Sequence, residues 1–251
     1  MIQITKIQIP AFPTVRPRRL YVYLPRGYTQ GKQRYPVLYM FDGHNLFYDS
    51  HATFGKSWGM KEYLERTKAQ LIVVAVESNR EGFRRISEYV PWDFHAPRPI
   101  GAVEGQGRET MEWFTKVLKP EIDKTYRTLP DREHTMIAGS SLGGLMSIYA
   151  ITAYNDVFSR AAALSPSMWV NPKGMAELIR SHPLASPTRI YLDMGTAEKA
   201  GDLRPLTAIF ETAKRLTKAG AEVAADVIPG AMHNEAAWEK CIPNMMQYLQ
   251  L

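Results

Sequence analysis

The sequence is poor in cysteine and lacks the features of several large classes of protein. Cys241 is the only cysteine among 251 residues, so no disulfide bond can form within the chain. No apolar run is long enough to span a bilayer, and we expect no membrane partner. Residues 1–7 alternate as a strand would and lack the apolar core of a signal peptide. With Met1 as the natural start, we therefore expect a cytoplasmic protein.

Patterns that bind metals, phosphates or nucleic acids are equally scarce. Cysteine and histidine do not occur at metal-ligand spacing, and no glycine-rich loop has the form that cradles phosphate. No internal repeat is present either, so nothing in the sequence calls for a metal or a cofactor. The net charge is +6, and its densest cluster, residues 16–19, is short and leads into a strand. Such a cluster favours a solvated edge over a nucleic-acid site.

What remains is the composition of an ordinary folded protein, with 45% hydrophobic and 22% charged residues. Its length fits one α/β domain, and we expect residues 1–251 to form it. Segments with strand and helix patterns alternate, which predicts a mostly parallel sheet with helices on both faces and antiparallel strands at the N-terminal edge. The predicted strands are residues 19–24, 36–41, 70–76, 160–164, 188–194 and 222–228, and the predicted helices are residues 58–67, 109–125 and 203–219.

The most informative segment is residues 139–143, Gly-Ser-Ser-Leu-Gly, because it lies between a strand-like run and a helix-like run. This pattern is typical of a nucleophile elbow, which presents a serine for acyl transfer. The sharp turn forces Ser141 towards positive φ, and Gly139 and Gly143 keep side chains away from the neighbouring backbone. The helix that follows directs backbone N–H groups at a developing oxyanion. The alternative is a glycine-rich turn with an idle serine.

A serine in such an elbow needs an acid and then a histidine later in the chain. Glu198 follows the predicted strand 188–194, where a carboxylate can hold the tautomer of a histidine. Asp202 lies in the same loop and is the rival acid, while a solvated Glu198 is the other alternative. His233 follows the last predicted strand, in the position of a base. His182, the other histidine downstream, lies at a polar helix end and is expected at the surface.

Residues 78–108 carry many polar residues and residues that break regular structure. Long irregular loops in compact domains are usually functional or disordered, and the aromatic side chains of this segment argue against disorder. We predict that it forms a lid and wall of the substrate pocket, although a surface excursion that covers the sheet is an alternative. The side chains expected in the pocket favour short or aromatic acyl esters over long-chain lipids. The predicted pocket residues are Gly43, Trp92, His95 and Trp169.

Several motifs together resemble the Putative esterase family of the α/β-hydrolase superfamily, which includes enterochelin esterase-like, esterase D-like and feruloyl esterase-like proteins. The resemblance covers most of the chain and implies an α/β-hydrolase fold and serine-dependent ester cleavage. By position, Ser141 matches the nucleophile, His233 the base and Glu198 the acid, where many relatives have an aspartate. The motifs are residues 39–47, 57–59, 85–89, 138–144, 165–167 and 230–235.

In this fold the loop after the strand predicted at residues 36–41 supplies an oxyanion donor. We expect the backbone N–H of His44, with that of Gly43 as the alternative, to act together with the N–H of Leu142. Asp42 is expected to brace this loop rather than to serve as the acid, because it precedes the nucleophile in the chain.

The predicted function is that of a serine carboxylic-ester hydrolase that acts through an acyl-enzyme on a small or aromatic ester. An acyltransferase or a thioesterase with the same triad is the nearest alternative, because these enzymes differ only in the acceptor or the leaving group. A non-catalytic binding protein of the same fold is an alternative of another class. The sequence makes no prediction of the oligomeric state.

Overall fold

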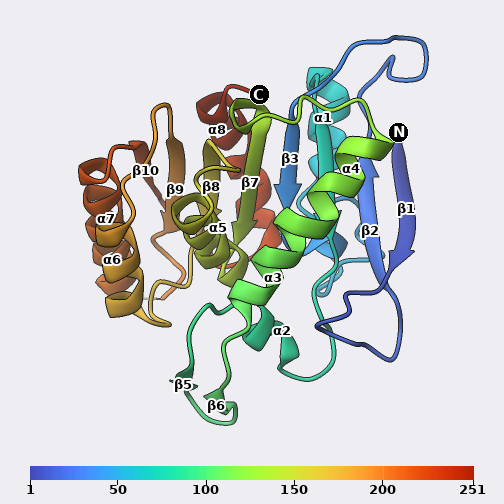
Figure 1. The fold of residues 1–251 in the computed structure, drawn as a ribbon. Helices are drawn as coiled ribbons and strands as arrows, with labels where there is room; N and C mark the ends of the chain where they lie inside the picture. The colour runs from blue at the N-terminus through green and yellow to red at the C-terminus, as the bar shows by residue number, and fades with distance from the viewer. Residues whose placement is uncertain (200) are drawn as a thin grey trace.

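The computed structural model describes residues 1–199 and 201–251, which are built around an eight-stranded sheet (Figure 1). The strand order is β1-β2-β4-β3-β7-β8-β9-β10. The pairs β1–β2 and β2–β4 are antiparallel and the other neighbouring pairs are parallel, as the sequence predicted. The strands of this sheet are β1 (Ile2–Ile7), β2 (Arg18–Tyr23), β3 (Val37–Met40), β4 (Ile72–Val76), β7 (Thr135–Ser140), β8 (Arg160–Leu164), β9 (Arg189–Gly195) and β10 (Glu222–Ile228).

Helices cover both faces of the sheet, which confirms the predicted architecture (Figure 1). The face in front in Figure 1 carries α3 (Gly107–Trp113), α4 (Lys119–Thr125), α5 (Leu142–Ala153), α6 (Pro172–Ser181) and α7 (Arg204–Lys218). The opposite face carries α1 (Met60–Thr67) and α8 (Glu235–Leu249). A π-helical turn, Phe114–Leu118, joins α3 to α4, so the single predicted helix 109–125 is one continuous element with a local irregularity. Within the described ranges, no helix combines the length and the apolarity needed to cross a membrane.

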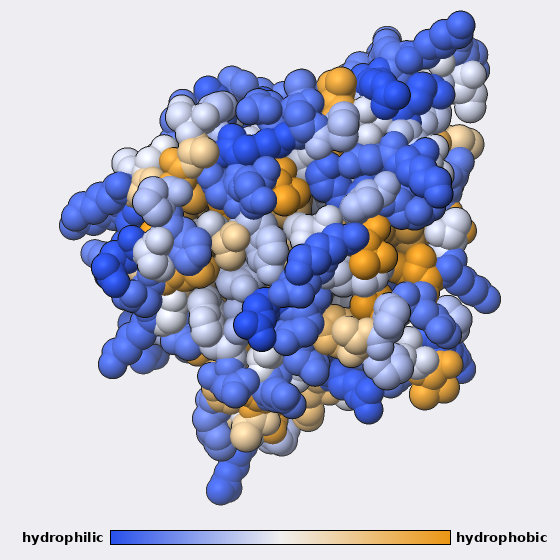
Figure 2. All heavy atoms as spheres, viewed as in Figure 1, coloured by the Kyte–Doolittle hydropathy of each residue, from blue (hydrophilic) through white to orange (hydrophobic). Residues whose placement is uncertain are grey.

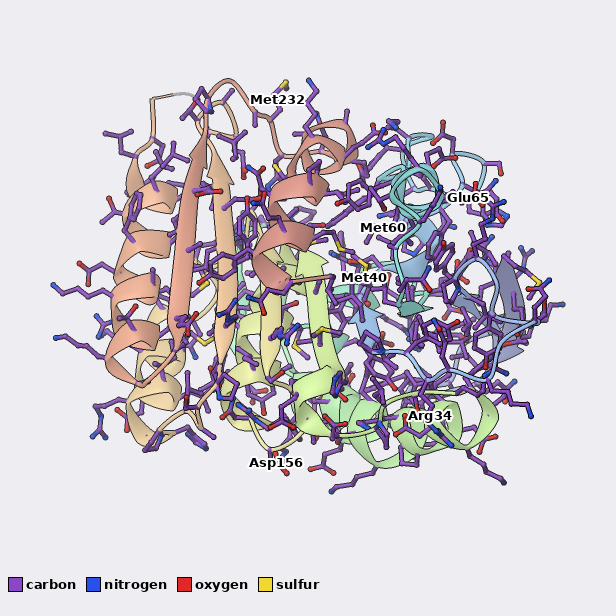
Figure 3. The ribbon with its side chains drawn as sticks, turned by 90° about the horizontal axis from the view of Figure 1, so that it is seen from above. Arg34, Met40, Met60, Glu65, Asp156 and Met232 are labelled. Carbon is purple, nitrogen blue, oxygen red and sulfur yellow. The ribbon has the colours of Figure 1, made fainter. Side chains whose placement is uncertain are left out.

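Two cores, one on each face of the sheet, follow from the alternation of side chains along the strands. In β3, Val37 and Tyr39 belong to the core under α3–α7, while Leu38 and Met40 belong to the core under α1 and α8. Met60 of α1 lies in this second core with Met40, and both are labelled in Figure 3. Strands buried on both faces read as continuous apolar runs, as observed for β3 and β4. The outer surface over α3–α7 is mostly hydrophilic, with small apolar patches (Figure 2).

Residues 78–108 are more regular than their composition indicated. They contain α2 (Arg84–Glu88) and a hairpin of β5 (Phe94–Ala96) and β6 (Gly101–Val103), which projects from the lower edge of the sheet in Figure 1. A buried ion pair ties the segment to the sheet, since the Arg18 guanidinium of β2 donates to the Glu88 carboxylate at 2.8 and 2.5 Å. Glu88 of this segment is therefore a buried partner of the sheet and not a loop residue.

Candidate active site

The predicted elbow has the backbone that its glycines imply. Ser141 lies between β7 and α5 with φ of 56° and ψ of −120°, a strained conformation for a residue with a side chain. A Cβ built on Gly139 would lie 2.7 Å from the carbonyl carbon of Gly143, too close for any side chain. A Cβ on Gly143 would in turn lie 3.0 Å from the Cβ of Phe41. The local packing thus requires glycine before the serine and leaves Ser141 at the carboxyl end of the sheet.

The structure brings Ser141, His233 and Glu198 together, although they are far apart in the chain. His233 Nε2 lies 2.9 Å from Ser141 Oγ, and His233 Nδ1 lies 2.7 Å from Glu198 Oε2. A carboxylate only accepts hydrogen bonds, so Nδ1 carries a proton here and Nε2 is left to accept the proton of the serine hydroxyl. This chain of contacts has the form of a nucleophile, a base and an orienting acid.

Neighbouring groups fix the second carboxylate oxygen of Glu198. Oε1 accepts the backbone N–H of Gly195 at 2.8 Å and the hydroxyl of Ser165 at 2.5 Å. The indole N–H of Trp238 donates to the same Ser165 hydroxyl oxygen at 2.9 Å. Burial alone would raise the pKa of Glu198, but the hydrogen bonds from His233, Ser165 and Gly195 outweigh it and hold the pKa below its usual value. Glu198 is therefore ionised at neutral pH.

The rival acid, Asp202, has different partners. Its two carboxylate oxygens accept from the Arg204 side chain at 2.8 Å each, and the Lys199 ammonium lies 3.3 Å away. Hydrogen bonds from Arg204 are the main reason that the pKa of Asp202 is lowered. No hydrogen bond joins Asp202 to His233 in the part of the chain that the structure describes, so the geometry favours Glu198 as the partner of the histidine.

The loop that carries Glu198 and the loop that carries His233 are hydrogen-bonded to each other. The N–H of Ala197 donates to the carbonyl of Ala231 at 3.0 Å, and the N–H of Thr196 donates to the carbonyl of Ile228 at 3.1 Å. The Thr196 hydroxyl accepts the N–H of Gly230 at 2.8 Å. These backbone contacts set the position of Glu198 relative to His233.

The predicted oxyanion donors are at the ends of β3 and β7. Leu142 is the first residue of α5, where an N–H has no acceptor inside the helix. His44 lies in the short helix Gly43–Asn45, and no described residue accepts the backbone N–H of either His44 or Leu142. The His44 imidazole is bonded through Nε2 to the Thr53 hydroxyl at 2.9 Å, and burial lowers its pKa to about 4, so the ring is neutral.

A pocket of about 510 Å³ opens beside His233 and Glu198. Trp169, a predicted pocket residue, belongs to its wall and packs edge-on against Phe94 of the hairpin, with ring centroids 6.0 Å apart. The other wall residues come mainly from the segments after β8 and β9 and from α7: Ser165, Pro166, Ser167, Met168, Pro172, Met194, Lys199, Asp202, Arg204, Pro205 and Ala208. Across residues 1–199 and 201–251, no group of three His, Cys, Asp or Glu side chains is arranged to hold a metal ion.

Three predicted pocket residues do not line this pocket. Gly43 packs against β4, where a Cβ would lie 2.6 Å from the carbonyl oxygen of Ala75. Trp92 is half-buried and packs edge-on against Tyr149 of α5 at 5.9 Å, which makes it a support of the helix. His95 is exposed on the hairpin. The hairpin contacts the wall residue Trp169 through Phe94, whereas the next residue, His95, is exposed, because alternate residues of a strand point to opposite sides.

Sequence reasoning missed the residues that surround the triad. The Ser165 hydroxyl donates to Glu198 and accepts from Trp238, and the Ser167 hydroxyl lies 3.4 Å from the Ser141 hydroxyl. In the sequence, residues 165–167 stand out only as part of a family motif, since serines after a strand carry no signal of their own. Their roles depend on contacts between distant segments.

Comparison with known proteins identifies the family of this chain. A model of the family described as Putative esterase matches residues 14–249. The chain is 22% identical over 247 residues to the uncharacterized protein YbbA of Bacillus subtilis, and the match covers 92% of each. It is 28% identical over 241 residues to an endo-1,4-beta-xylanase/feruloyl esterase of Xylanibacter ruminicola, with 91% of this chain and 28% of that protein covered.

Solved structures show the same fold. An IroE-like serine hydrolase from Shewanella oneidensis superposes with a TM-score of 0.79 at 19% identity, over 100% of this chain and 79% of that one. The mostly parallel sheet with helices on both faces is therefore an α/β-hydrolase fold. With the family model matched over nearly the whole chain, the protein belongs to the Putative esterase family and is an esterase.

Proposed function

We propose that this esterase cleaves carboxylic esters through a covalent acyl-enzyme. Ser141 is the nucleophile, His233 the general base and acid, and Glu198 the carboxylate that orients the histidine. The observation that carries the proposal is the pair of hydrogen bonds from His233, 2.9 Å to Ser141 Oγ and 2.7 Å to Glu198 Oε2. These two contacts join a nucleophile to a base and the base to a carboxylate, which is the geometry expected of a catalytic site.

The reaction follows from these contacts. Ser141 Oγ attacks the ester carbonyl carbon while its proton passes to His233 Nε2, and Glu198 stabilises the resulting imidazolium. The backbone N–H groups of His44 and Leu142 bind the oxyanion, each worth about 3 kcal/mol of barrier. The tetrahedral intermediate expels the alcohol, which takes the proton from His233. Water then attacks the acyl-enzyme with His233 again as base, and the acid leaves as Ser141 regains its proton.

A small or aromatic ester is the substrate class that the pocket favours. Its volume of about 510 Å³ is in the usual range for small-molecule sites, and Trp169 offers a flat aromatic wall. Met168 and Met194 add apolar surface, while Arg204 puts a cation at the margin. The feruloyl esterase named for the Xylanibacter relative supports the same class, although the match covers only 28% of that protein.

The test is a substitution combined with a covalent probe. Ser141→Ala is expected to remove activity on p-nitrophenyl acetate by several orders of magnitude without unfolding the protein, and a fluorophosphonate should label Ser141. Ser140→Ala is the matched control and should keep both activity and label. If Ser141→Ala retains turnover, or if the label is found on another residue, the proposal is wrong.

The acyl acceptor needs a separate measurement, because an acyltransferase or a thioesterase would use the same triad. Product analysis with added alcohols, and rates on acyl-CoA, distinguish the three activities. Hydrolysis that dominates in the presence of alcohol supports the proposal. A panel of feruloyl, acetyl-sugar and siderophore esters then narrows the substrate.

A further inference from the structure

The helix α2 contacts the loop that follows β3 through two side chains. The Arg85 guanidinium donates to both carboxylate oxygens of Asp42, at 2.8 and 2.7 Å. The hydroxyl of Tyr89, the residue after α2, accepts the backbone N–H of Asp42 at 3.2 Å. Arg85 in turn stacks over the Tyr89 ring, with its guanidinium carbon 5.1 Å from the ring centroid. Asp42, Arg85 and Tyr89 thus form one connected cluster, and Asp42 directly precedes the segment with the predicted oxyanion donor.

The backbone at Asp42 needs this support. Asp42 has φ of 54° and ψ of 45°, the left-handed conformation that residues with side chains seldom adopt. It turns the chain from β3 into the short helix that contains His44. On the other side of the loop Gly43 packs so closely on Ala75 that no side chain would fit. The loop therefore packs between β4 and α2, and Arg85 binds it through the Asp42 side chain.

Charge gives a second reason for the contact. A Cβ built on Gly143 would lie 3.4 Å from Asp42 Oδ2, so the carboxylate lies beside the first turn of α5, close to the proposed oxyanion site. Burial would raise the pKa of Asp42, but Arg85 outweighs it and lowers the pKa, so the pair is ionic. An unpaired anion here would oppose a developing oxyanion, and the bidentate arginine offsets that charge.

We propose that Arg85 is a positioning residue for the esterase reaction. Through Asp42 it holds the backbone N–H of His44 where the oxyanion forms, and it neutralises the carboxylate next to that site. The inference rests on the proposed function. It also gives a role to residues 85–89, in which Arg85 and Tyr89 hold the oxyanion loop while Glu88 anchors α2 to Arg18 of β2.

The experiment compares Arg85→Ala with Arg84→Ala, a neighbouring arginine that is exposed and forms no ion pair among the described residues. For Arg85→Ala we expect kcat to fall about 100-fold, the size of effect seen when one oxyanion donor is lost, with KM changed less than about threefold. The affinity for an alkyl boronic acid, which mimics the tetrahedral intermediate, should fall in parallel with kcat/KM. Millimolar guanidinium should restore part of kcat in Arg85→Ala, and Arg84→Ala should behave as the parent protein.

A purely structural role would lower the melting temperature without a selective loss of boronate affinity and without guanidinium rescue, and that result overturns the inference. If Arg85→Ala does not fold, Asp42→Asn and Tyr89→Phe test the same contacts, and both must lower kcat and boronate affinity together. Failure of the proposed function is seen separately, because Ser141→Ala would then keep its activity. If Ser141→Ala is inactive and Arg85→Ala is unaffected, the proposed function stands and only the inference about Arg85 is wrong.

Discussion

Gly195 and Ala231 lie in direct contact, so closely that a Cβ built on Gly195 would overlap the carbonyl oxygen of Ala231. Gly195 ends β9 three residues before Glu198, and Ala231 lies two residues before His233. The hydrogen bond of 2.7 Å between Glu198 and His233 therefore depends on two loops that pack backbone to backbone. Glycine at this position brings the two loops within reach of each other.

Gly195→Ala should separate these loops. Overpacking of this kind costs about 1–3 kcal/mol of stability, and displacement of Glu198 should lower kcat about tenfold or more. Gly31→Ala is the control, because the nearest atom to a Cβ there is 3.5 Å away. Denaturant unfolding and steady-state kinetics measure both effects. Unchanged kcat in Gly195→Ala would mean that the loop contact does not set the geometry of the triad.

Glu198→Gln and Asp202→Asn separate the two candidate acids. Loss of the carboxylate beside His233 leaves the histidine in the wrong tautomer, which in a serine triad lowers kcat about 10⁴-fold. Asp202 is paired with Arg204 and Lys199, so Asp202→Asn should stay within about threefold of the parent rate. Steady-state rates on p-nitrophenyl acetate decide, and the reverse order would assign the acid to Asp202.

Asp193 should make stability depend on pH. The side chain is buried, Oδ1 accepts the N–H of Ser165 at 3.0 Å and Oδ2 has no partner in the described chain. Burial raises its pKa to about 7 from the usual 3.8. Between these values the folded protein keeps a proton that the unfolded chain releases, so this group lowers the free energy of unfolding as pH rises from about 4 to 7.

Asp193→Asn keeps the shape and the acceptor but not the charge. We expect the free energy of unfolding of the variant, relative to that of the parent, to rise by a few kcal/mol from pH 4 to pH 8, since one pKa unit corresponds to about 1.4 kcal/mol. Urea unfolding at several pH values measures this difference. Asp156→Asn is the control, because Asp156 is exposed at the surface (Figure 3). A difference that does not change with pH would show that Asp193 is ionised in both states.

Trp169→Ala tests the predicted acyl preference. Removal of this aromatic wall should lower kcat/KM for a feruloyl or benzoyl ester about fivefold, because an aromatic contact is worth about 1 kcal/mol beyond burial. The value for an acetyl ester should stay nearly unchanged. Phe54→Ala, at an exposed phenylalanine outside the pocket wall, is the control. A chain-length series on the parent protein completes the test. A maximum at long acyl chains with interfacial activation contradicts the prediction.

Local patterns account for the parts of the fold that were predicted well. The strands at residues 160–164 and 222–228 have the predicted bounds, because an apolar or alternating run between polar breaks leaves little choice of where a strand ends. The sharp turn at Ser141 was predicted from the glycines at positions 139 and 143, which lie within five residues. In contrast, the regular structure within residues 78–108 was not expected, because its polar side chains pair with partners such as Arg18 and Asp42 that lie far away in the chain.

By itself the sequence determined most strands of the main sheet and the turn at Ser141, since each of these depends on residues close together in the chain. Tertiary structure decided the rest. Glu198 and Asp202 are four residues apart and chemically alike, and only the packing of their loop against residues 228–231 brings one of them to His233. The pocket wall and the partner of Arg85 were decided in the same way, because contacts between segments distant in sequence depend on the path of the whole chain.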